Sequence, residues 1–244
     1  MRPIAILVAT GLTAGYGGAP VINDVCLEVG EREIVSVVGP NGSGKSTLLK
    51  AMIGAVALAS GSVLFKGTEV GNWATEDLIR TGIGYVPQVD DVFGAMTVLE
   101  NLEMGGYLLS NEALKERVPH VLDLFPALRK MLNRPADKLS GGERKMLAMG
   151  RVLMLKPSLF ILDEPTANLA PAVAQTLLHE HIRSLTDTGA AVLLVEQRAR
   201  SALEISDWTY VMGGGRCHVD GSSADLAARP DFADAFLGGA STAT

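Results

Sequence analysis

The feature that most constrains this 244-residue chain is a glycine-rich segment that matches the pattern G-x-x-x-x-G-K-[ST] in full. The segment runs Gly39-Pro40-Asn41-Gly42-Ser43-Gly44-Lys45-Ser46-Thr47. An apolar, mostly β-branched run over 34–38 precedes it, as in a strand buried on both faces, and a helical pattern from 45 to about 53 follows. Glycines let consecutive backbone N–H groups curl around phosphates, and the helix N-terminus adds partial positive charge. Strand, turn and helix in this order predict a nucleotide site in an α/β fold, rather than an ordinary glycine-rich turn.

Two side chains of this segment have defined chemical tasks. Lys45 is expected to reach the β and γ phosphates and to stabilise charge on the transferred phosphoryl group. The Ser46 hydroxyl is expected to ligate Mg²⁺. We therefore predict that the whole segment, 39–47, contacts a nucleotide and that the metal is held at its C-terminal end.

A second strand ends in two carboxylates. The run Leu159-Phe160-Ile161-Leu162 is apolar and is followed directly by Asp163 and Glu164. A carboxylate at the carboxyl edge of a parallel sheet lies where nucleotide-bound Mg²⁺ would sit, so Asp163 is predicted as a metal ligand. Glu164 is then placed to polarise an attacking water. The alternative interpretation is that Asp163 and Glu164 are simply two solvated acids at a strand end. The glycine-rich segment at 39–47 argues against it.

The order of elements supports a sheet flanked by helices. Strand patterns are predicted at 4–9, 21–29, 33–38, 62–65, 83–86, 159–162 and 191–195. Helical periodicity covers the middle of the chain from about 98 to 154, and a further helix is predicted over 171–185, with proline at its start. Strands that alternate with helices indicate a parallel sheet covered by helices.

Composition excludes several classes of protein. The chain has 21 basic and 27 acidic residues, a net charge of −6, and only 5% aromatic residues, which argues against nucleic-acid binding. Cys26 and Cys217 lie far apart and the four histidines form no ligand pattern, so reduced thiols are expected and a His/Cys metal site is not. The longest apolar run, 51–59, is too short for a membrane span.

A family resemblance emerges at Leu139-Ser140-Gly141-Gly142-Glu143. Ser140 and Glu143 have the spacing of a helix capping box, and the two glycines leave an anion site at the same helix start. Together with the phosphate-binding segment, Tyr85-Val86-Pro87-Gln88 and Asp163-Glu164-Pro165-Thr166, this pentapeptide resembles the ATP-binding subunit of ATP-binding-cassette (ABC) transporters over nearly the whole chain. Three finer motifs are similar to the branched-chain amino-acid importers, and nearly as similar to importers of urea or short amides: Val98-Leu99-Glu100-Asn101-Leu102, Leu169-Ala170-Pro171 and Leu194-Val195-Glu196-Gln197.

The resemblance implies a fold: a P-loop NTPase (RecA-like) parallel-sheet core with an antiparallel β edge and an inserted helical subdomain. We expect a single ABC ATPase domain over 1–244, with the core at 1–87 and 155–244 and the helical subdomain at 88–154. GTPase and kinase functions are not expected, because the chain lacks the Asn-Lys-x-Asp guanine-recognition segment and a kinase has no use for the Leu139–Glu143 motif.

The resemblance also implies roles for individual residues. Tyr16 would stack on adenine, unless it is only a hairpin tyrosine. Gln88 would contact Mg²⁺ or the attacking water, unless it is a solvated loop glutamine. Ser140, Gly141 and Gly142 would touch the γ-phosphate of ATP held by a second ATPase subunit in a head-to-tail homodimer or heterodimer.

Two positions depart from the pattern of many family members. Gln197 stands where many have histidine, and Ala170 stands where many have aspartate. Gln197 is able to donate a hydrogen bond to a γ-phosphate but does not become cationic. The resemblance still places Gln197 among the catalytic residues, with Glu164 as general base and with Lys45.

The implied function is that of a motor. ATP binding would close a dimer, hydrolysis would open it, and integral membrane permease subunits would convert the cycle into import, with an extracytoplasmic substrate-binding protein acting indirectly. The chain would then be peripheral, at the cytoplasmic face of the cell membrane, with ATP and Mg²⁺ as its cofactors. The alternatives are an importer of urea or other amides, or a soluble ABC ATPase with no part in transport.

The permease contact is expected just after Gln88. The stretch Val89–Met96 carries three apolar side chains, Val92, Phe93 and Met96, that would receive a short helix of a membrane subunit. Packing of these side chains within the domain is the alternative.

Overall fold

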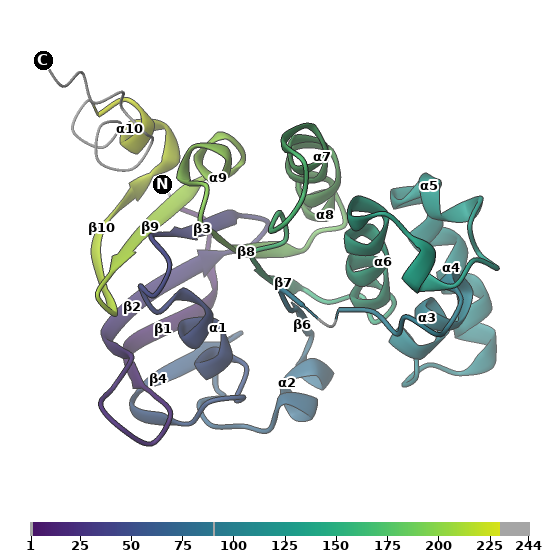
Figure 1. Cartoon of the computed structure of the whole chain (residues 1–244). Coiled ribbons are helices and arrows are strands. Elements are labelled where there is room, and N and C mark those ends of the chain that lie inside the picture. The colour runs from purple at the N-terminus through teal and green to yellow at the C-terminus, as the bar shows by residue number, and fades with distance from the viewer. Residues whose placement is uncertain (1, 90, 230–244) are drawn as a thin grey trace, which may run out of the picture.

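A six-stranded sheet forms the centre of the fold (Figure 1). The computed structural model describes residues 2–89 and 91–229. In spatial order the strands are β10 (Arg216–Ser222), β9 (Trp208–Gly213), β3 (Ile34–Val38), β8 (Ala191–Glu196), β7 (Leu159–Asp163) and β6 (Ile83–Val86). All neighbouring pairs are parallel except β10 with β9, which form an antiparallel hairpin. Every residue of β3, β7 and β8 is buried, as continuous apolar strands covered on both faces require.

The expected antiparallel edge is a separate four-stranded sheet. Its strands, in spatial order, are β2 (Ile22–Gly30), β1 (Ala5–Ala14), β4 (Leu58–Phe65) and β5 (Thr68–Glu69). This sheet packs on one side of the main sheet, and helix α1 (Lys45–Met52) lies between them in a shared apolar core. Strand β1 runs five residues beyond the predicted end at Ala9, because its second half, Thr10–Ala14, pairs with both β2 and β4.

Helices cover the opposite side and extend beyond the β6 edge (Figure 1). The middle of the chain is helical as predicted, with α3 (Val98–Gly105), α4 (Asn111–Leu124), α5 (Pro126–Arg129), the 3-10 turn η1 (Ala136–Lys138) and α6 (Gly141–Leu153). Capping boxes start two of them, Thr97 with Glu100 for α3 and Ser140 with Glu143 for α6. The predicted capping role of Ser140 is therefore confirmed.

The remaining helices connect or flank the sheet. They are α2 (Thr75–Thr81), α7 (Pro171–Thr176), the π-helical η2 (Leu177–Ile182), α8 (Arg183–Asp187), α9 (Ala199–Ile205) and α10 (Ser223–Ala227). The predicted helix over 171–185 is confirmed as the continuous run α7–η2–α8, with a π-helical centre that the periodicity did not indicate. Across residues 2–89 and 91–229, none of these helices combines the length and apolar character that crossing a bilayer demands.

The centre of the main sheet should dominate the stability of the fold. Leu193, in the middle of β8, is fully buried, whereas Leu108 is 37% exposed. We expect Leu193→Ala to lower the free energy of unfolding by about 2–5 kcal/mol, because the truncation leaves a cavity in a packed core. Leu108→Ala, the same chemical change at an exposed position, should cost well under about 1 kcal/mol. Urea unfolding of the two variants measures both values, and equal losses would contradict this description of the core.

Candidate active site

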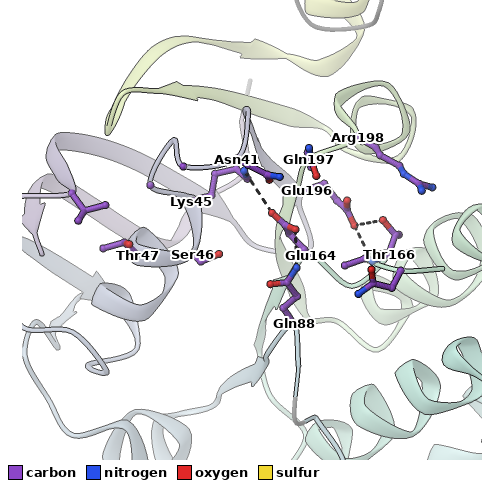
Figure 2. Close-up of a pocket in the computed structure, with 15 residues that line it drawn as sticks. Asn41, Lys45, Ser46, Thr47, Gln88, Glu164, Thr166, Glu196, Gln197 and Arg198 are labelled. Carbon is purple, nitrogen blue, oxygen red and sulfur yellow. Dashed lines mark hydrogen bonds and ion pairs between the residues drawn. The ribbon is translucent and has the colours of Figure 1, made fainter. Parts of the chain in front are cut away.

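The carboxyl ends of three parallel strands meet at one edge of the main sheet. Val38, the last residue of β3, pairs with Glu196 at the end of β8, and Asp163 at the end of β7 pairs with Val195. The loops that follow these strands surround a cavity of about 600 Å³ (Figure 2), a volume in the usual range for small-molecule sites. Residues that the sequence singled out make up much of the lining: Asn41, Gly42, Gly44, Lys45, Ser46, Thr47, Gln88, Glu164 and Gln197.

The loop between β3 and α1 is shaped by glycines at two places. A Cβ on Gly39 would lie 2.2 Å from the backbone oxygen of Met212, so only glycine allows the loop to pass this close to β9. Gly44 caps α1 with a φ of +99°, a conformation that side chains with a Cβ rarely adopt. The first N–H groups of α1 are thereby presented next to the cavity, in the arrangement that binds phosphate groups.

Lys45 is held over this loop by backbone oxygens. Its Nζ is buried and donates to the carbonyl oxygens of Gly39, at 2.9 Å, and Pro40, at 3.0 Å. Glu164 Oε1 lies 3.6 Å from the same nitrogen (Figure 2). Within the described residues, the buried Ser43 hydroxyl on this loop has no hydrogen-bond partner, as expected of a group that serves a ligand. A buried cation beside backbone donors suits a polyphosphate.

Ser46 and Asp163 meet as the sequence predicted. The Ser46 hydroxyl donates to Asp163 Oδ1 at 3.0 Å, and the Tyr85 hydroxyl lies 3.4 Å from Asp163 Oδ2. Burial raises the pKa of Asp163, while the hydrogen bond from Ser46 opposes that rise. A hydroxyl and a carboxylate side by side are hard oxygen donors, which fit Mg²⁺ in the presence of phosphates.

Glu164 occupies a strained position between two partners. Its φ of +45° is uncommon for a residue with a side chain, and such strain is found at functional sites. Lys45 approaches one carboxylate oxygen, and Gln88 Nε2 donates to the other, Oε2, at 3.0 Å (Figure 2). Gln88, predicted near the metal or the attacking water, is thus in direct contact with the predicted base.

The other predicted residues lie outside this cavity lining. Tyr16 is 63% exposed on the turn between β1 and β2. Ser140, Gly141 and Gly142 begin α6, where a Cβ on Gly141 would lie 2.8 Å from Leu169 and one on Gly142 would lie 2.6 Å from Val173. These glycines therefore keep the start of α6 tightly packed against the start of α7. Their contact with nucleotide on a second subunit stays a prediction.

The Ala170 departure has a local structural consequence. Ala170 occupies the N-cap position of α7 and makes no side-chain hydrogen bond to the helix. Aspartate at this position would accept a bond from the first turn of the helix. The loop after Glu164 is consequently held by its other contacts.

The sequence reasoning missed several residues of the cavity. They are Val21, Thr166, Ala167, Asn168, Glu196 and Arg198. Thr166 and Glu196 lie within motifs that were recognised, but the pairing of β7 beside β8 is needed to see that they meet. The extension of the main sheet by β9 and β10 was also missed.

Comparison with known proteins agrees with this geometry. The family model for ABC transporters matches residues 22–167. A probable branched-chain amino acid transport ATP-binding protein, LivF, from Archaeoglobus fulgidus is 40% identical over 227 residues, which cover 93% of this chain and 96% of LivF. BraG, a high-affinity branched-chain amino acid transport ATP-binding protein from Pseudomonas aeruginosa, is 42% identical over 224 residues, which cover 92% of this chain and 96% of BraG. A crystal structure of the ADP conformation of an ATP-binding cassette superposes with a TM-score of 0.86 at 27% identity, covering 97% of this chain and 100% of that one.

Removal of the Lys45 charge should weaken nucleotide binding. We expect Lys45→Ala to lower ATP affinity roughly 10- to 100-fold, because a hydrogen bond to a charged group contributes about 1.5–3 kcal/mol. Lys115→Ala, at an exposed position of α4, is the matched control. Titration with a fluorescent ATP analogue measures both affinities, and equal affinities would exclude this phosphate contact.

Proposed function

This chain belongs to the ABC transporter family, and we propose that it is the ATP-hydrolysing subunit of an importer of branched-chain amino acids. One observation carries the catalytic part: Lys45, Glu164 and the Ser46–Asp163 pair converge at one edge of the main sheet. The substrate class is supported by the two relatives named for branched-chain amino acid transport, at 40% and 42% identity over nearly their full lengths.

Each converging group has a role in phosphoryl transfer. ATP binds with its phosphates on the loop at 39–44 and on the first turn of α1, where Lys45 and backbone N–H groups stabilise the charge that develops. Glu164 accepts a proton from the attacking water as general base, and Gln88 orients both. Gln197, exposed at the end of β8, donates a hydrogen bond toward the γ-phosphate without adding charge.

A divalent metal completes this site. Ser46 and Asp163 would hold Mg²⁺, and Gln88, which donates to Glu164, would be a further ligand through its amide oxygen. When bound, the ion neutralises charge on the β and γ phosphates. The Tyr85 hydroxyl lies near Asp163 Oδ2, the oxygen that Ser46 does not contact, and this keeps Oδ1 oriented toward Ser46.

Two ATP sites would form between two ATPase subunits. Ser140, Gly141 and Gly142 lie at the start of a 13-residue helix outside the chain's own cavity, which suits contact with nucleotide on the partner. The exposed ring of Tyr16 is available to stack on adenine. The second subunit is either another copy of this chain or a different ATPase.

A groove beside the main site suits the permease subunits. This cavity of about 260 Å³ lies between β6, α3 and α6, and its lining includes Tyr85, Asp91, Met104, Tyr107 and Arg151. The Met104 and Tyr107 side chains are 44% and 57% exposed. A groove with exposed apolar side chains at its edge is the kind of surface that receives an amphipathic helix.

Of the three apolar side chains predicted to receive the membrane subunit, Phe93 is the most exposed. It is 44% exposed, and the Arg151 guanidinium lies 4.3 Å from the centre of its ring. Its backbone is held at both ends by Asn101, through bonds of 2.8 and 3.0 Å. Val92 instead packs partly against the core, so the packing alternative is correct for that residue.

The chain would then work at the cytoplasmic face of the membrane. It would bind integral permease subunits directly and depend on an extracytoplasmic binding protein only through them. An importer of urea or another amide uses the same machinery and differs in the permease and binding protein. A soluble role outside transport would leave the groove at α3 and α6 without a membrane partner.

Glu164→Gln tests the assignment of the base. The variant keeps the shape of the side chain but does not accept the proton, so ATP should still bind while turnover falls about 10²–10⁴-fold. Glu180→Gln, at an exposed position of η2, serves as control and should hydrolyse ATP normally. Phosphate release and nucleotide binding are measured in parallel. Wild-type turnover by Glu164→Gln would remove the residue from this role.

Phe93→Asp tests the permease contact. A carboxylate in place of the exposed Phe93 ring should abolish co-purification of polytopic membrane proteins with the tagged chain, while ATP binding is retained. Val219→Asp changes an exposed apolar residue on β10 and should leave the assembly intact. Membrane subunits are identified by mass spectrometry after detergent solubilisation. Recovery of the same permeases with both variants would show that Phe93 only packs against the domain.

A further inference from the structure

A buried carboxylate with no role in the scheme above lies beside the proposed base. Glu196, the last residue of β8, is 2% exposed and lines the main cavity. Its Oε1 accepts two hydrogen bonds from Thr166, one from the hydroxyl at 2.7 Å and one from the backbone N–H at 3.1 Å (Figure 2). Burial of a carboxylate is unfavourable unless hydrogen bonds replace its lost hydration. Thr166 supplies two such bonds to Glu196, so the two residues stabilise each other in this position.

The contact fastens the loop that carries Glu164. Thr166 lies two residues after Glu164, and the Glu164 N–H donates to the Val195 carbonyl at 3.0 Å. The loop after β7 is thus attached to the end of β8 at two consecutive points, Glu164 to Val195 and Thr166 to Glu196. Glu164 is held between them with its φ of +45°, a conformation that persists only where the surroundings enforce it.

The same contact reaches the other side of the cavity. Gln197 directly follows Glu196, so anchoring the Glu196 side chain also fixes the backbone from which Gln197 extends into the cavity lining. Ala170, further along the loop, supplies no cap to α7. The Thr166 hydroxyl therefore fastens, through its bond to Glu196, the part of this loop that lies between Glu164 and α7.

Glu196 is not itself arranged as the base. One of its oxygens is occupied by both Thr166 donors, whereas Glu164 faces Lys45 and Gln88. We propose that Glu196 is a positioning residue that acts through Thr166 to hold Glu164 and Gln197 in the geometry for hydrolysis. The proposal rests on the ATPase function proposed above.

Thr166→Val is the central test. Valine keeps the shape of threonine but removes the hydroxyl donor, so kcat should fall about 10- to 100-fold from misplacement of the base, with KM for ATP changed less than about twofold. Thr166→Ser restores the hydroxyl and should regain most of the lost rate. If the unmodified protein hydrolyses ATP and Thr166→Val has the same kcat, the proposal is overturned.

A matched control separates positioning from general loosening of the fold. Thr209 on β9 is also fully buried, and its hydroxyl lies 2.7 Å from those of Ser36 and Ser223. Thr209→Val therefore deletes a similar buried hydroxyl away from the cavity and should keep kcat, even if its thermal midpoint falls as far as that of Thr166→Val. An equal loss of kcat in both variants would overturn the positioning role.

A double-mutant cycle decides whether the two residues act as one unit. Thr166→Val removes only the hydroxyl bond, whereas Glu196→Ala removes both bonds to Thr166. Glu196→Ala should therefore lose at least as much kcat as Thr166→Val, and the double variant Thr166→Val/Glu196→Ala should lose no more than Glu196→Ala. Losses that multiply would overturn the proposed path through Thr166. If Glu196→Ala does not fold, the kcat values of Thr166→Val, Thr166→Ser and Thr209→Val decide whether the Thr166 contact positions the base. Absence of hydrolysis by the wild-type chain would instead refute the proposed function itself.

Discussion

The parallel register of β3, β8 and β7 is the constraint on which the rest of the molecule depends. Val38 pairs with Glu196, and Asp163 pairs with Val195, so three strands distant in sequence end at one level. The loops that follow carry the glycine-rich segment at 39–44, the acidic pair and Gln197. Parallel strands direct their following loops to the same edge, which is why ligand sites occur there. A shift of one strand by a residue would separate Lys45 from Glu164.

Electrostatic compensation explains why so many charged groups tolerate burial at that edge. Lys45 is satisfied by two carbonyl oxygens and Glu164, Asp163 by Ser46 and Tyr85, and Glu196 by Thr166. Burial still raises the pKa of Asp163 and of Glu196, because hydrogen bonds offset only part of the lost hydration. This arrangement of charges suits the proposed ligand, a nucleotide whose phosphates carry a bound cation.

Gln88 lies between the two cavities and is held from both sides. Its side chain donates to Glu164 in the main site, and its backbone oxygen accepts from Lys145 of α6 at 2.7 Å. Lys145 also forms a buried ion pair with Asp91, which lines the groove between β6, α3 and α6. The path from that groove to the proposed base thus consists of direct contacts, and it includes the helix that begins at Ser140.

The sequence by itself determined the local features of this protein. Four predicted features depend on short-range patterns, and all are present in the structure. They are the glycine-rich turn between β3 and α1, the strand ending at Asp163, the capping box at Ser140 and the helical middle of the chain. Strands β9 and β10 and the Glu196–Thr166 contact were not predicted from it. β9 and β10 form a hairpin between residues close in sequence, and its Gly214-Gly215 turn was a local signal that was overlooked. The pairing of β9 with β3 and the Glu196–Thr166 contact join residues 30 or more positions apart, which leaves no periodic signal in one chain. Only the tertiary structure decided that Glu196 supports the loop of Glu164, because burial and partner are set by packing.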